Sequence, residues 1–158
     1  MTEKYYLAYG SNLNMAQMTY RCRDAVKMGT TMIKDYRLMY KGSKTGAYLT
    51  IEPAKGYVVP VGVWAVSERD EKSLDIYEGY PNFYYKKKTK LRINGDEPRE
   101  VDAFVYIMHE DRPLGIPSNM YVNTCRQGYR DFGFDEKILD DAYQYSISKY
   151  KPKKVSKK

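Results

Sequence analysis

Short runs in which apolar and polar residues alternate predict that much of the chain forms β-strands. In the run from Tyr84 to Ile93 every second residue is basic or aromatic, so successive side chains would lie on opposite faces of a sheet. Turn-forming residues separate the runs at Gly42–Gly46, Pro53–Gly56 and Asn94–Gly95. Pro60 within one run indicates a sheet edge or a bulge, because proline donates no backbone hydrogen bond. The six predicted strands are Lys4–Tyr9, Tyr36–Lys41, Ala47–Ile51, Val58–Val66, Tyr84–Ile93 and Val101–Met108.

Helical spacing and capping residues predict four helices between and after these strands. Ser67 and Asp70 resemble a capping box for a helix that ends near Glu78, and Gly79 suits the position after its last turn. The order of the elements is typical of an α+β fold, with a compact, mixed and strongly curved sheet flanked by helices. The other three helices begin at Asn12 or Asn14 and run to about Arg23, begin at Ser118 and run to about Gln127, and begin at Asp135 with an apolar stripe of Ile138, Leu139, Ala142 and Tyr145.

The positive charge of the chain is concentrated at one end. The 158 residues carry a formal net charge of +7, but six of the 27 basic residues lie in 149–158, and the remaining 21 nearly balance the 20 acidic residues. We therefore predict a single domain over residues 1–148, followed by a lysine-rich, flexible tail over residues 149–158. A solvated tail is favoured over one that contacts RNA or a membrane surface.

Cysteine, histidine and hydropathy narrow the possible classes of protein. Cys22 and Cys125 lie far apart without a CxxC pattern, which is typical of thiols in a reducing cytoplasm. We find no signal peptide and no apolar run of the roughly 20 residues that a membrane span requires, so a cytoplasmic protein without membrane contacts is predicted. The single histidine, His109, excludes a histidine-rich metal site, and no metal or other cofactor is expected.

Glu78 is the residue best suited to acid–base chemistry. It follows Leu74 by four residues, so both side chains lie on one face of the predicted helix and are directed toward the interior. Burial and the negative end of the helix would each raise the pKa of Glu78 toward neutrality, as a general acid or base requires. On the next strand, Tyr85 is predicted to point inward beside Glu78, because the alternate face is rich in lysine and is expected to face solvent. An exposed glutamate at the end of a helix is the alternative interpretation.

The turn Gly10–Leu13 is the second candidate for a functional site. It joins a strand to the start of a helix, and the N–H groups of such a turn form a concave cluster of donors for an anion or a developing oxyanion. The turn lacks the glycine spacing of a dinucleotide fingerprint or a phosphate loop. A plain connection between strand and helix is therefore the alternative.

Four short motifs in the same order resemble those of the γ-glutamylcyclotransferase family, including its AIG2-like members. They are YLAYGSNL, LDIYEGYPNFY, AFVYIM and PSNMYVNTCRQG, which all lie within residues 5 to 128. The resemblance implies a small β-barrel-like sheet flanked by helices, with Glu78 as the catalytic acid/base. It also implies that one run of backbone binds the glutamyl group and that three tyrosines surround the pocket. These residues are Tyr9, Gly10, Ser11, Asn12 and Leu13 for the backbone, and Tyr85, Tyr106 and Tyr121 for the tyrosines.

The expected reaction is the intramolecular cyclisation of a small-molecule γ-glutamyl amide to 5-oxoproline, with release of an amine or amino acid. The sequence leaves open whether the substrate is glutathione, a γ-glutamyl amino acid, a γ-glutamyl amine or a carrier-bound γ-glutamyl group, because YPNF after Glu78 departs from the family pattern. A non-catalytic small-molecule binder of the same fold is the alternative. A nucleic-acid binder, suggested by Lys86–Lys90 and the tail, is less favoured because the rest of the chain is nearly neutral, so no nucleic-acid partner is predicted. The sequence leaves open whether the protein forms a homodimer.

Overall fold

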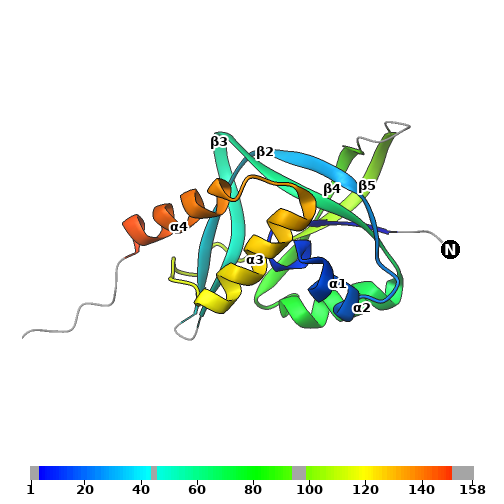
Figure 1. Ribbon diagram of the computed structural model, residues 1–158, viewed down its shortest axis with the longest axis horizontal. Helices are drawn as coiled ribbons and strands as arrows, with labels where there is room; N and C mark the ends of the chain where they lie inside the picture. Colours follow the sequence, from blue (N-terminus) through cyan, green and yellow to red (C-terminus); the bar gives the residue numbers. More distant parts are fainter. Residues whose placement is uncertain (1–3, 44–45, 94–98, 151–158) are drawn as a thin grey trace, which may run out of the picture.

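The computed structural model describes residues 4–43, 46–93 and 99–150 (Figure 1). Within these residues five strands form one sheet in the order β2-β3-β1-β5-β4, and four α-helices accompany it. Strand β1 pairs antiparallel with β3 and parallel with β5, so the predicted mixed sheet and α+β architecture are confirmed. The elements are β1 (Lys4–Ala8), the 3₁₀ turn η1 (Ser11–Leu13), α1 (Met15–Arg21), β2 (Val26–Ser43), β3 (Gly46–Val66), α2 (Glu68–Glu78), β4 (Tyr84–Ile93), β5 (Arg99–Met108), α3 (Asn119–Phe132) and α4 (Lys137–Lys149).

Strands β2 and β3 form one long, bent hairpin. The predicted strands Ala47–Ile51 and Val58–Val66 are both parts of β3. Strand β2 begins at Val26, although the corresponding predicted strand began only at Tyr36. The sequence does not mark the first half of β2 as a strand, because some of its apolar side chains, such as Met32, are exposed. They interrupt the alternation of apolar and polar residues.

The turn predicted at Pro53–Gly56 is a bulge rather than a chain reversal. One residue of β2, Asp35, lies opposite residues 54–57 of β3. Asp35 has a positive φ of 62°, and its carboxylate accepts a hydrogen bond from the N–H of Gly56 at 2.9 Å. Pro60 lies where β3 has a strand on one side only, as predicted for a sheet edge. The pairing of β1 with β3 stops at Gly62, so at Pro60 the described partner of β3 is β2.

The sheet curls until its two edge strands approach each other. The Nζ of Lys87 in β4 donates to the hydroxyl of Tyr36 in β2 at 2.6 Å, although the two strands are not neighbours in the described sheet. Apolar side chains fill the inside of the curl, and Ile51, Val105 and Ile107 are each no more than 2% exposed. Burying a side chain of this size contributes about 1.5–3 kcal/mol, so the curled sheet is a firm support for the elements at its end.

Local side chains define both ends of α2. The hydroxyl of Ser67 accepts a hydrogen bond from the N–H of Asp70 at 3.1 Å, and the Asp70 carboxylate accepts one from the N–H of Ser67 at 3.2 Å. This is the predicted capping box. At the other end Gly79 has a φ of 63°, a left-handed conformation that favours glycine and ends the helix. Leu74 is fully buried and so holds one face of α2 toward the interior.

Helix α3 approaches the turn η1 very closely. A Cβ atom on Gly128 would lie 2.6 Å from the backbone nitrogen of Asn14, so a side chain there would push the helix away. The helix begins after its predicted cap, Ser118, and runs to Phe132, beyond the predicted end at Gln127. This close contact between α3 and the turn explains why the last residue of the PSNMYVNTCRQG motif, Gly128, is a glycine.

Helices α1 and α4 begin near their predicted caps. Asn14 caps α1 and accepts a hydrogen bond from the N–H of Gln17 at 3.0 Å. The carboxylate of Asp135 accepts one from the N–H of Lys137 at 2.9 Å, at the start of α4. None of the described helices has the length and apolar character needed to cross a membrane.

Parts of two predicted turns and most of the predicted tail lie outside the described residues. These are Asn94–Gly95, residues 44–45 within Gly42–Gly46, and residues 151–158.

Candidate functional site

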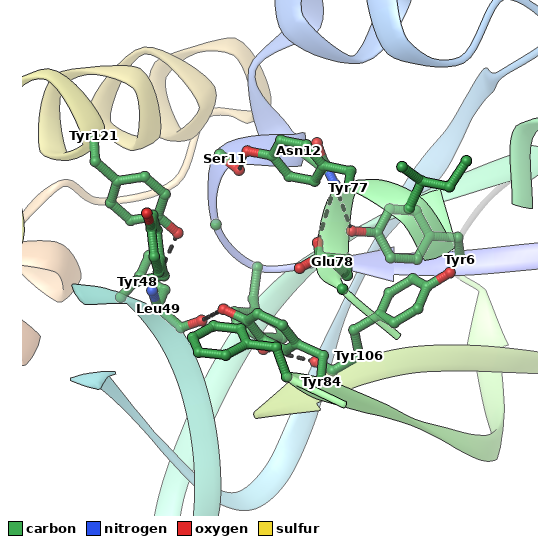
Figure 2. Close-up of a pocket in the computed structure, with 15 residues that line it drawn as sticks. Tyr6, Ser11, Asn12, Tyr48, Leu49, Tyr77, Glu78, Tyr84, Tyr106 and Tyr121 are labelled. Carbon is green, nitrogen blue, oxygen red and sulfur yellow. Dashed lines mark hydrogen bonds between the residues drawn. The ribbon is translucent and has the colours of Figure 1, made fainter. Parts of the chain in front are cut away.

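A cavity of about 320 Å³ lies where the ends of β1 and α2 and the start of α3 meet the sheet (Figure 2). Its inner end is closed by nearly buried side chains, since Tyr6 is 4% exposed and Tyr106 is 2% exposed. The cavity is open to solvent beside Tyr48, which is 40% exposed, and beside Tyr77, which is 43% exposed. Eight of the lining residues are aromatic: Tyr6, Tyr9, Tyr48, Tyr77, Phe83, Tyr84, Tyr106 and Tyr121.

Glu78, the last residue of α2, lines this cavity, and Figure 2 shows its carboxylate directed inward. The residue keeps some exposed surface, but protein atoms surround the carboxylate. Burial raises the pKa of Glu78 to about 8, while the positive charge of Arg21 acts in the opposite direction. The direction of this shift is the one predicted from the sequence. A carboxyl group of this pKa can take up and return a proton near neutral pH.

Asn12 connects Glu78 to the turn and to α1. Its side-chain nitrogen donates to the hydroxyl of Tyr6 at 2.9 Å and makes a longer contact, 3.5 Å, with Oε1 of Glu78. Its side-chain oxygen accepts a hydrogen bond from the guanidinium of Arg21. Its backbone carbonyl accepts one from the indole N–H of Trp64 at 3.0 Å. Because both ends of the amide are engaged, its NH₂ group is held toward the Glu78 carboxylate.

The turn before α1 presents backbone donors beside the cavity. The N–H groups of Gly10, Ser11 and Asn12 have no acceptor among the described residues, and all three residues line the cavity. The N–H of Leu13 donates to the carbonyl of Gly10 at 3.0 Å, which closes the turn. The Leu13 side chain is fully buried and Leu13 does not line the cavity, so the structure does not bring this predicted residue to the site with the rest of the turn.

The structure brings most of the predicted site residues together. The hydroxyl of Tyr9 donates to the backbone carbonyl of Tyr106 at 2.7 Å, which ties β1 to β5. The hydroxyl of Tyr121 accepts a hydrogen bond from the N–H of Leu49 at 3.1 Å, which ties α3 to β3. The predicted residues that line the cavity are Tyr9, Gly10, Ser11, Asn12, Glu78, Tyr106 and Tyr121.

Tyr85 does not line the cavity, and the prediction that it points inward beside Glu78 is wrong. Its ring instead lies 5.3 Å from that of His109, on the other face of β4. The neighbouring Tyr84 takes the predicted place. It is 6% exposed, lines the cavity, and donates from its hydroxyl to the carbonyl of Leu49 at 2.8 Å.

The physical reason for this error is a partly buried lysine. The alternation of β4 is as predicted, but its lysine-rich face was expected to face solvent. Lys86 on that face is covered by α2, where its Nζ forms ion pairs with Glu71 at 2.6 Å and Asp75 at 2.8 Å. The face that carries Tyr84 and Lys86 therefore points toward α2 and the cavity.

Four cavity tyrosines were not predicted as site residues. Tyr77 precedes Glu78 in the LDIYEG motif, and its hydroxyl lies 3.0 Å from that of Ser11. Tyr6 lies in the YLAYGSNL motif, so the motifs contain both Tyr6 and Tyr77 and were sufficient to predict them. Tyr84 follows from the alternation of β4 once its inner face is known. Tyr48 comes from β3, outside every motif, and no local signal marks it.

A family model described as "Gamma-glutamyl cyclotransferase, AIG2-like" matches residues 6–123. A solved structure described as gamma-glutamyl cyclotransferase is 24% identical, with 99% of this chain and 93% of that chain aligned and a TM-score of 0.74. An uncharacterized protein from Homo sapiens is also 24% identical, over 100% of this chain and 94% of that chain, with a TM-score of 0.74.

YkqA from Bacillus subtilis is 16% identical, over 96% of this chain and 56% of that chain, with a TM-score of 0.76. At these identities the structural likeness shows the fold alone. A comparison with curated proteins gave no match. Since the family model spans the turn, α2, the sheet and the start of α3, the chain belongs to the gamma-glutamyl cyclotransferase, AIG2-like family.

Proposed function

We propose that this protein is a γ-glutamylcyclotransferase-type enzyme, which converts a small γ-glutamyl amide to 5-oxoproline and releases an amine or amino acid. One observation carries the proposal: a single cavity holds the Glu78 carboxylate, whose pKa is about 8, together with backbone N–H groups at Gly10, Ser11 and Asn12 that have no acceptor among the described residues. Membership of the family supports the same activity.

In this reaction the substrate supplies its own nucleophile. The α-amino nitrogen attacks the side-chain carbonyl carbon and forms the ring C–N bond, and the C–N bond to the leaving amine then breaks. The α-amino group must first lose a proton, and a typical group of this kind has a pKa of about 8. Glu78 is matched to this proton, because its own pKa is about 8. Glu78 passes this proton to the leaving nitrogen, which departs as an amine. The ring nitrogen still carries one proton too many, and Glu78 takes up this second proton and gives it to the released amine, so that the products are 5-oxoproline and an ammonium ion and the carboxylate is restored.

The turn has a different task, which is to hold negative charge. The N–H groups of Gly10, Ser11 and Asn12 can donate to the α-carboxylate of the glutamyl group or to the oxyanion of the tetrahedral intermediate. The enzyme must also hold the amine ~3–3.5 Å from the carbonyl carbon, and a cavity of about 320 Å³ is of a size that suits a small folded substrate.

The test is a substitution that removes the base but keeps its shape. Glu78→Gln is expected to lower kcat/KM for 5-oxoproline release by about 10²–10⁴-fold, the usual contribution of general acid–base catalysis. The assay uses a panel of γ-glutamyl amino acids and γ-glutamyl amines. Glu71→Gln is the matched control, because it removes a carboxylate from the same helix outside the cavity lining. It should leave turnover close to the wild-type value.

Two outcomes would contradict the proposal. Near-normal turnover by Glu78→Gln would remove Glu78 from the chemistry. Saturable binding of 5-oxoproline to the wild-type protein without turnover of any compound in the panel would identify a non-catalytic binder with the same fold.

A further inference from the structure

The cavity has an aromatic outer wall, which consists of Tyr48, Phe83 and Tyr121. The ring of Tyr48 packs nearly perpendicular to both others, with centroids 6.1 Å from Phe83 and 5.1 Å from Tyr121. Figure 2 shows Tyr48 and Tyr121 on the side of the cavity away from Tyr6. The three rings come from β3, from the segment before β4 and from α3, so tertiary contacts alone assemble this wall.

Under the proposed function, the outer wall faces the part of the substrate that leaves. The glutamyl unit occupies the inner side, where its α-ammonium group meets Glu78 and its α-carboxylate meets the turn. Tyr6 and Tyr106 close the inner end. Tyr48 and Tyr77 both line the cavity with exposed surface, 40% and 43%, but the hydroxyl of Tyr77 lies 3.0 Å from that of Ser11 in the turn that holds the glutamyl unit. The substituent on the leaving nitrogen therefore extends toward the opening beside Tyr48.

The cavity offers this substituent no cation. Among the described residues that line it, none is lysine, arginine or histidine, whereas Glu78 supplies a carboxylate. Two arginines lie close to lining residues without lining the cavity themselves: Arg21 is held by Asn12, and Arg112 lies over the ring of Phe83 at 4.8 Å. A carboxylate on the leaving group would thus add a further negative charge to an aromatic cavity that already holds Glu78 and the α-carboxylate, without a cationic lining partner.

We infer, on the basis of the proposed function, that the preferred substrate is the γ-glutamyl derivative of an amine that bears an aromatic ring and no carboxylate. A ring placed beside Tyr48 can make the edge-to-face contacts that the rings of the outer wall already make with one another. Such an amine also adds no negative charge near Glu78. γ-Glutamyl amines of this kind are thereby favoured over glutathione and γ-glutamyl amino acids.

The test compares three compounds that differ by one group each. γ-Glutamyl-2-phenylethylamine carries the ring alone, γ-glutamylethylamine lacks the ring, and γ-glutamylphenylalanine adds a carboxylate to the ring. The first compound should have a kcat/KM for 5-oxoproline release about tenfold above that of either of the others, the order expected from ring contacts and from one unpaired charge. An equal or higher value for γ-glutamylphenylalanine or γ-glutamylethylamine would overturn the inference.

A pair of tyrosine variants shows whether the outer wall causes the preference. Tyr48→Ala should reduce the tenfold ratio between the phenylethylamine and ethylamine derivatives to near one. Tyr57→Ala is the control, since Tyr57 is a similarly exposed tyrosine of β3 that does not line the cavity, and it should keep the ratio. A ratio unchanged by Tyr48→Ala would overturn the inference while leaving the proposed function intact. Failure of all three compounds to yield 5-oxoproline would overturn both.

Discussion

Two glutamates of helix α2, Glu71 in its first half and Glu78 at its end, have pKa values that their surroundings shift in opposite directions. In the first half, Glu71 accepts hydrogen bonds from the Nζ atoms of Lys4 and Lys86, each at 2.6 Å. Burial would raise the pKa of Glu71, but the hydrogen bonds and charges of these two lysines outweigh it and hold the pKa below its usual value. At the end of the helix, Glu78 meets the neutral amide of Asn12 at 3.5 Å, and burial raises its pKa to about 8.

The two direct cations keep Glu71 charged in spite of its partial burial, whereas burial is the largest influence on Glu78, which has no direct cation to oppose it. Glu71 belongs to an ion-pair cluster of Lys4, Glu71, Lys86 and Asp75. Asp75 in this cluster also accepts a hydrogen bond from the hydroxyl of Tyr106 at 2.6 Å, and the Tyr106 ring lines the cavity. The cluster thus supports the wall of the site without entering it, whereas Glu78 lies inside the cavity and keeps a proton that it can exchange.

The largest expected effect is on stability, and its sign is opposite to that of most buried substitutions. The pKa of Glu78 is about 8 in the folded protein against a usual value of 4.5. Below about pH 4 both states are protonated, but between the two values the unfolded chain loses its proton first, so wild-type stability falls as the pH rises. Glu78→Gln should therefore be more stable than wild type, on the order of 4 kcal/mol at about pH 9, and nearly equal to it at about pH 4. Urea unfolding at the two pH values measures this difference.

Glu71→Gln is the matched control for this prediction. The lowered pKa of Glu71 stabilises the folded protein above the pKa of the unfolded chain, and this stabilisation is lost as the pH falls through the folded pKa. The variant should thus be less stable than wild type at about pH 9, with a smaller difference in acid. If both glutamine variants were less stable than wild type at about pH 9, the contrast between the two positions would be wrong.

The second largest expected effect is the loss of stability when Lys86, the cation paired with two carboxylates of α2, is replaced. Lys86 has 14% of its side chain exposed and pairs with both Glu71 and Asp75. Lys86→Met should lower the free energy of unfolding by about 1–3 kcal/mol at neutral pH, because it removes a shared partner from two partly buried carboxylates. Lys88→Met, which removes an exposed lysine from the same face of β4, should change stability by less than about 0.5 kcal/mol. Equal losses in the two variants would show that the ion pairs contribute nothing specific.

The two carboxylates also show how far the sequence alone could predict this protein. Helix α2 was predicted from end to end because its signals are local: Ser67 and Asp70 define its start, Gly79 its end, and the spacing of Leu74 and Glu78 its inner face. The raised pKa of Glu78 followed from that face. Signals within a few residues of one another were thus sufficient for the catalytic candidate.

Features that depend on partners far along the chain were not predictable in the same way. The alternation of β4 is correct, but its inner face was misassigned, because the burial of Lys86 depends on carboxylates that lie 11 to 15 residues earlier in α2. Tyr48 reaches the cavity only because β3 folds back along β2 and α3 brings Tyr121 against it. The general position of the site was therefore readable from motifs, which contain Phe83 and Tyr121 of the outer wall, while Tyr48, the third residue of that wall, was not.

The smallest expected effect tests the positive charge that acts on Glu78. Arg21 donates to the side-chain oxygen of Asn12, and its guanidinium stacks 3.4 Å from the centroid of the Tyr77 ring. Its charge lowers the pKa of Glu78 and so partly offsets the effect of burial. Arg21→Met should raise that pKa further and move the acidic limb of the pH profile of kcat/KM to higher pH. Turnover should then fall several-fold at pH 7, and the difference from wild type should shrink as the pH rises above both pKa values, where Glu78 is ionised in both proteins.

Arg21→Lys separates the charge of this residue from its geometry. Lysine keeps a positive charge near the cavity but cannot present the planar guanidinium to Asn12 and Tyr77 together. If charge is what matters, the acidic limb of Arg21→Lys stays near that of wild type while the limb of Arg21→Met moves. If both variants instead lose the same fraction of turnover at every pH, Arg21 acts by orienting the Asn12 amide, and the ionisation of Glu78 is then set by burial alone. In that case the contrast along α2 would be sharper still, with two lysines governing the glutamate in the first half of the helix and no cation governing the one at its end.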